Sequence, residues 1–212
     1  MRTHFFLVPL LAIFFLSCNE KENVSIKEDI LKEEAIIENV AKDVDKIIQF
    51  LYTREFTNFE EALLYSEINF IPSTRTPRDP ESILISDEAM ITIDNMRNMQ
   101  VPDGMTLDAY RSELLRILNL SLLDIHSGEY IALVDAINAT IAVIQLKSDL
   151  EVTTKGLLSI LKCVGGTLGS AGLGALAGAA VGTIALPLVG TVSGTAVGAI
   201  SGALTGAAEF CL

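Results

Sequence analysis

Residues 163–211 read CVGGTLGSAGLGALAGAAVGTIALPLVGTVSGTAVGAISGALTGAAEFC, and this stretch decides the fold of the chain. No charged residue lies between Lys162 and Glu209, and glycine or serine recurs at every fourth position through both halves. Residues four apart stack on nearly the same face of an α-helix. Each half therefore predicts a helix with one nearly bare stripe, flanked by Leu, Ile, Val and Ala.

Two such stripes allow two helix backbones to approach closely, so that van der Waals contacts and Cα–H···O bonds hold the pair together. In a helix without such a partner, each glycine costs about 1 kcal/mol relative to alanine. We therefore predict that residues 156–212 form an antiparallel helical hairpin, a glycine zipper. The glycines predicted to pack are Gly166, Gly174, Gly178, Gly182, Gly190, Gly194, Gly198, Gly202 and Gly206.

Pro187 marks the predicted turn, because proline lacks an N–H and its ring clashes with the preceding turn of a helix. Cys163 and Cys211 lie equally far from Pro187 in the sequence. Antiparallel helices would bring these cysteines together, and a disulfide there would stabilise the fold by about 4 kcal/mol in the chain-entropy model. Each arm would be about 30 Å long, close to the thickness of a hydrocarbon core.

The first residues, MRTHFFLVPLLAIFFLSC, have Arg2 before an apolar run that is short for a membrane span and typical of a secretory signal. Leu16-Ser17-Cys18 resembles the lipobox of bacterial lipoproteins, in which a small residue precedes the lipidated cysteine. The resemblance implies a signal peptide over residues 1–17 and a lipid on Cys18. Because Asn19 follows, it also implies transport to the outer membrane, with exposure at the cell surface as a further option. The alternative is an ordinary signal peptide with an incidental cysteine.

If Cys18 carries lipid, Cys163 and Cys211 are the two cysteines left to pair in an oxidising envelope compartment. The alternative is that they are two unpaired small apolar residues.

Between the lipidated tether, residues 18–24, and the hairpin, residues 25–155 predict an acidic helical bundle. The net charge is −12 and every acid except Glu209 precedes Cys163, which argues against nucleic acid as a partner. Apolar residues at three- and four-residue steps predict helices over 25–51 and 59–67, from Asp87, from Thr106 to a glycine cap at Gly128, and from Glu129 towards Lys155. The fold class is all-α. The Pro/Arg loop over residues 70–86 is interpreted as a solvated loop, with contact to a partner or to acidic headgroups as the alternative.

Side chains that carry chemistry are scarce. His126 is the only histidine outside the signal segment, and it falls at a predicted helix end, where the helix dipole favours it. The sequence has no metal-ligand spacing, phosphate-binding loop or nucleophile elbow. We therefore expect a protein that is not an enzyme and that needs no metal or cofactor.

Residues 162–211 resemble the glycine-zipper regions of bacterial envelope lipoproteins and the Gly-x-x-x-Gly-rich peptides of class II bacteriocins, which insert into membranes. This resemblance implies a hairpin that associates with or inserts into a membrane, with lipid as its partner and self-association through the zipper as a further option. The alternative is a structural or partner-binding lipoprotein whose hairpin packs on its own body or on copies of itself. The sequence does not identify a protein partner. A permeabilising role fits poorly with the weak charge of the tail, where only Lys155 and Lys162 oppose Glu209.

Overall fold

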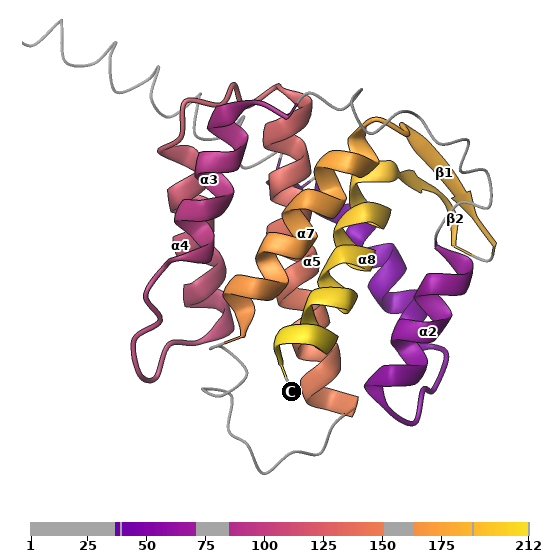
Figure 1. The fold of residues 1–212 in the computed structure, drawn as a ribbon. Coiled ribbons are helices and arrows are strands. Elements are labelled where there is room, and N and C mark those ends of the chain that lie inside the picture. Colours follow the sequence, from indigo (N-terminus) through magenta and orange to yellow (C-terminus); the bar gives the residue numbers. More distant parts are fainter. Residues whose placement is uncertain (1–36, 39, 71–84, 151–162, 188, 212) are drawn as a thin grey trace, which may run out of the picture. The chain divides into compact units, whose positions relative to one another are not determined.

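A computed structural model describes residues 37–38, 40–70, 85–150, 163–187 and 189–211 (Figure 1). The chain divides into two units between Asn39 and Val40, and every element named below belongs to the second unit. Within the described residues, the fold is all-α apart from one two-stranded sheet. The predicted fold class is therefore confirmed.

The acidic body is built of helices, most of which begin at a side-chain cap. A helix over residues 40–52 is followed by α2 (Phe59–Asn69), α3 (Asp87–Arg97), α4 (Leu107–Asn119) and α5 (Gly128–Leu150). Asn58, Ser86 and Thr106 cap α2, α3 and α4, each accepting a backbone N–H from three residues further on. These caps satisfy N–H groups that have no partner inside the helix. The predicted helix starts at Asp87 and after Thr106 are confirmed.

The segment between α4 and α5 departs from the prediction of one helix ending at Gly128. Instead α4 ends at Asn119, and Gly128 is the first residue of α5. Ser127 caps α5 by accepting the N–H of Tyr130, while Asp124 accepts the N–H of His126. Such short-range side-chain bonds compete with helical ones, so the chain turns here although its apolar spacing continues.

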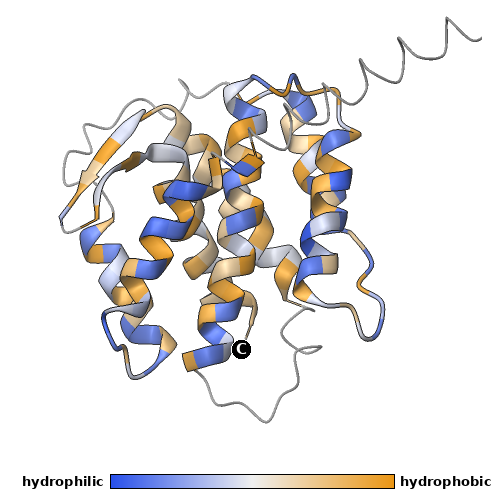
Figure 2. Cartoon of the chain, turned by 180° about the vertical axis from the view of Figure 1, so that it is seen from behind, coloured by the Kyte–Doolittle hydropathy of each residue, from blue (hydrophilic) through white to orange (hydrophobic). Residues whose placement is uncertain are grey.

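Helix α5 forms the core of the unit. Its Leu133, Ile137 and Ile144 are fully buried, and α4, α7 and α8 pack against it. Of the described helices, α5 is the one long and apolar enough to cross a membrane, and 72% of its apolar window is buried inside the fold. Burial of this kind is typical of the core helix of a globular fold. In Figure 2, hydrophilic and hydrophobic residues alternate along the surrounding helices, as expected when each has one buried face.

The tail consists of α7 (Val164–Ala179), β1 (Thr183–Leu186), β2 (Gly190–Ser193) and α8 (Gly194–Phe210). The strands pair antiparallel, with Thr183 opposite Ser193 and Leu186 opposite Gly190. The chain therefore turns near Pro187 as predicted, but a β-hairpin carries the turn instead of the two helices. Its β-branched residues are Thr183, Ile184, Thr191 and Val192, a residue type that favours strands.

The strands shorten the helical arms. Helices α7 and α8 have 16 and 17 residues, which corresponds to about 25 Å of helix. The predicted arms of about 30 Å were therefore too long. The difference brings both helices below the usual length of a membrane span.

Candidate functional site

A disulfide closes the open end of the tail. Cys163, the residue before α7, is bonded to Cys211, the residue after α8, and their Cα atoms lie 5.1 Å apart. This is the pair that the sequence predicts. It requires the two helices to run antiparallel, and Figure 1 shows α7 and α8 lying side by side.

Backbone meets backbone where α7 and α8 cross. A Cβ added to Gly174 would overlap the carbonyl oxygen of Gly198, and one added to Gly178 would overlap that of Gly194; both relations also hold in the reverse direction. Gly202 lies in the same way against the carbonyl of Ser170. A real side chain at these positions would force the helices apart.

The interface continues towards the disulfide, where side chains as well as backbone face the glycines. A Cβ on Gly206 would lie 2.8 Å from the Cα of Thr167, whereas one on Gly166 would run into the ring of Phe210. Gly166 therefore faces a side chain rather than the opposing backbone. That ring is 45% exposed, so Gly166 has the more adaptable neighbour.

Gly182 and Gly190 do not pack helix against helix, so this part of the prediction was wrong. Gly182 lies between α7 and β1, and Gly190 is the first residue of β2. A Cβ would meet nothing within 4 Å at either position, and their φ angles are +80° and +95°. These glycines are required for their backbone conformation, which is strained for residues with a Cβ. Their regular spacing in the sequence concealed this different role.

A second glycine face on α7 was missed by the sequence analysis. A Cβ on Gly165 would lie 2.5 Å from the carbonyl oxygen of Arg97, and one on Gly169 would lie 3.2 Å from Cδ of the same residue. Gly172 adjoins Ile93 and Leu133. The spacing of Gly165, Gly169 and Gly172 is also helical, so this signal was present but was overshadowed by the longer series.

The start of α8 is joined to the body through two acids, the buried Asp135 and the half-buried Asp43. The hydroxyl of Thr195 donates to Oδ2 of Asp135 in α5, while the backbone N–H of Ser193 donates to Oδ2 of Asp43 at 2.9 Å. The side chain of Asp135 is 1% exposed, and its Oδ1 has no hydrogen-bond partner among the described residues. Asp135 is not among the predicted site residues, although it is an acid within an apolar helical run.

The pKa of Asp135 is raised to about 7, chiefly by burial and to a smaller extent by the charge of Asp43, although hydrogen bonds from Thr195 and Ser193 lower it. Burial dominates because the ionised carboxylate loses its hydration. The hairpin therefore meets α5 at a group that titrates near neutral pH.

Of the remaining residues singled out in the sequence, Cys18 and residues 71–84 lie outside the described residues. His126 is exposed in the turn before α5. Within the described residues, no group of three or more His, Cys, Asp and Glu side chains could hold a metal ion.

No family model matches this chain, and comparisons with curated proteins and with solved structures found no match.

Proposed function

We propose that this protein is a non-enzymatic lipoprotein of the cell envelope whose C-terminal hairpin packs on its own body and stabilises it. In this proposal the lipid on Cys18 provides the attachment to the outer membrane. The observation that carries it is the burial of the apolar side chains of the hairpin: Leu168, Leu176, Ile200 and Leu204 are at most 4% exposed.

Magnitudes favour keeping the hairpin in the body. A fully buried Leu or Ile side chain contributes about 1.5–3 kcal/mol relative to an exposed one. If the hairpin left the body and entered a bilayer, insertion would contribute about 0.3–0.6 kcal/mol for each Leu, Ile or Val. The bilayer would not cover the face of α5 that carries Leu133, which is fully buried beside Gly172 of α7 and would then meet water.

Membrane association of the hairpin is the second candidate. It is favoured by the absence of charge from Cys163 to Ala208 and by the exposed apolar side chains of Leu173, Val181 and Phe210. The disulfide and the glycine contacts would also keep α7 and α8 paired away from α5, which would satisfy their backbone groups in lipid. In this proposal, lipid is the partner of the hairpin.

Partition without the lipid anchor separates the two candidates. A Cys18→Ala variant exported on an ordinary signal peptide would be recovered in the soluble fraction if the hairpin stays in the body. Sedimentation with membranes that withstands carbonate extraction would instead establish insertion. Wild-type protein should sediment in either case, and treatment with a lipase that removes acyl chains tests the anchor itself.

A further inference from the structure

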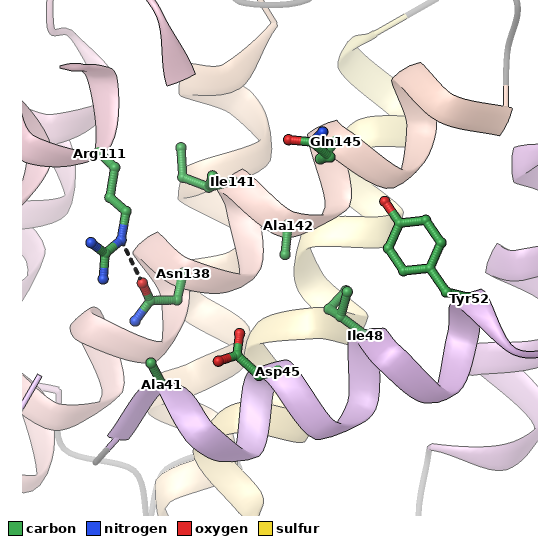
Figure 3. A pocket seen from close by; sticks show the side chains of 9 residues that line it. All are labelled: Ala41, Asp45, Ile48, Tyr52, Arg111, Asn138, Ile141, Ala142 and Gln145. Atoms are coloured by element: carbon green, nitrogen blue, oxygen red, sulfur yellow. Dashed lines mark hydrogen bonds between the residues drawn. The ribbon is translucent and has the colours of Figure 1, made fainter. Parts of the chain in front are cut away.

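A cavity of about 320 Å³ lies between the helix over residues 40–52 and α5, with Arg111 of α4 on its wall. Small-molecule sites in proteins typically have volumes of about 300–1,000 Å³. Figure 3 shows Arg111 and Asn138 together at one end, Tyr52 and Gln145 towards the other, and Ile48 between them. The cavity therefore has a polar end and an apolar middle.

The polar end holds one buried donor that has no partner among the described residues. Nε of Arg111 donates to Oδ1 of Asn138 at 2.8 Å, which orients the amide. Nδ2 of Asn138 is then left buried without a hydrogen-bond partner among the described residues, although the residue is only 8% exposed. A buried donor without a partner costs about 1–3 kcal/mol. Because less than 1 Å² of Nδ2 is accessible, the donor that a ligand can reach at this end is the half-buried guanidinium of Arg111.

Opposite charges line this end without neutralising each other. Asp45 extends its carboxylate into the cavity from the helix over residues 40–52 (Figure 3). Among the described residues, neither Asp45 nor Arg111 forms an ion pair within 4.0 Å. A simple anion would be repelled by Asp45 and by the net charge of −12, and a simple cation would be repelled by Arg111. A molecule that carries both charges matches the site.

We propose that this cavity binds a small zwitterion, an α-amino acid with an apolar side chain. The carboxylate accepts hydrogen bonds from the guanidinium of Arg111, because a guanidinium matches the geometry of a carboxylate. The ammonium group binds the carboxylate of Asp45. The side chain lies along Ile48 and Ile141. This binding site is independent of the proposed envelope function.

Calorimetric titration tests the ligand class. The purified chain carrying Cys18→Ala, without its signal peptide, is titrated with L-leucine, L-valine and L-phenylalanine. Two truncated analogues of leucine serve as matched controls: 4-methylpentanoate lacks the ammonium group, and 3-methylbutylamine lacks the carboxylate. We expect saturable binding of at least one amino acid and at least about tenfold weaker binding of both leucine analogues than of leucine. Equal binding of leucine and either analogue, or no saturable binding of any amino acid at millimolar concentration, would overturn the proposal.

Variants locate the site. Arg111→Gln and Asp45→Asn should each weaken binding by at least about tenfold, whereas Arg116→Gln should not. Arg116 is a matched control because it lies on the same helix, 58% exposed and paired with Glu113. Urea unfolding of each variant monitors the fold. If Arg111→Gln does not fold, the affinity of Asp45→Asn decides, because Asp45 is exposed and its substitution should not disturb the fold. A folded Asp45→Asn variant with unchanged affinity contradicts the site.

Discussion

The carbonyl oxygen of Gly198 occupies the place where a Cβ of Gly174 would lie, and the carbonyl of Gly174 does the same to Gly198. Neither glycine has a positive φ. Both are required because a neighbouring backbone takes the space of a side chain, which is a property of the tertiary contact and not of the helix itself.

Gly198→Ala should therefore destabilise the protein by about 1–3 kcal/mol, the usual cost of inserting a methyl group into a packed interior. Helix propensity alone predicts the opposite sign, a gain of about 1 kcal/mol. Gly128→Ala is the matched control, because a Cβ there meets nothing within 4 Å. Urea unfolding midpoints of the two variants measure the difference, and a Gly198→Ala variant as stable as Gly128→Ala would contradict the close contact.

The change in stability on substituting Gly190 should depend on backbone conformation rather than on the volume of the new side chain. Its φ of +95° with no neighbour within 4 Å of a Cβ predicts that Gly190→Ala costs about 1 kcal/mol through strain. Gly190→Val should cost more, since β-branched residues tolerate positive φ poorly. Thermal unfolding should rank glycine above alanine and alanine above valine; equal melting temperatures for all three would refute this role.

The stability of the body should depend on pH through Asp135. Its pKa is raised from an ordinary 3.8 to about 7, so between these values the folded state holds a proton that the unfolded state releases. Stability contributed by this group is therefore present below pH 4 and is lost as the pH rises towards 7. Asp135→Asn cannot ionise and should be more stable than the wild type at pH 8, by roughly 1–3 kcal/mol.

The measurement is the difference in unfolding free energy between variant and wild type at pH 4, 6 and 8, which cancels the titration of shared groups. Asp94→Asn serves as the control at an exposed position on α3. A difference for Asp135→Asn that stays constant with pH would show that the buried acid does not titrate in this window.

Removing the disulfide should weaken the tail without separating its helices. Cys163 and Cys211 are 48 positions apart in the sequence, so their bond restricts a long loop and contributes about 4 kcal/mol in the chain-entropy model. A Cys163→Ala/Cys211→Ala variant should unfold at lower urea concentration but keep its helical circular dichroism. Mass spectrometry of wild-type protein, before and after reduction, should differ by two hydrogens; identical masses would remove the bond.

Local features of this chain were determined by the sequence alone. The caps at Ser86 and Thr106 depend on residues within one turn, and the glycine series predicts contact surfaces because helical spacing is local. The equal distances of Cys163 and Cys211 from Pro187 predicted their pairing for the same reason. These inferences need only the geometry of one or two elements.

Only the tertiary structure decided what the hairpin packs against and which residues matter there. The sequence pattern describes an apolar face but not its partner, because the hydrophobic effect has no direction; here α5 covers that face. Asp135 meets Thr195 across 60 positions of sequence, and Gly165 meets the carbonyl of Arg97 on another helix. Gly182 and Gly190 continue the four-residue spacing of the packing glycines but belong to the turn. The reason is that β1 and β2 lie between them, so both helices end before the glycine series does.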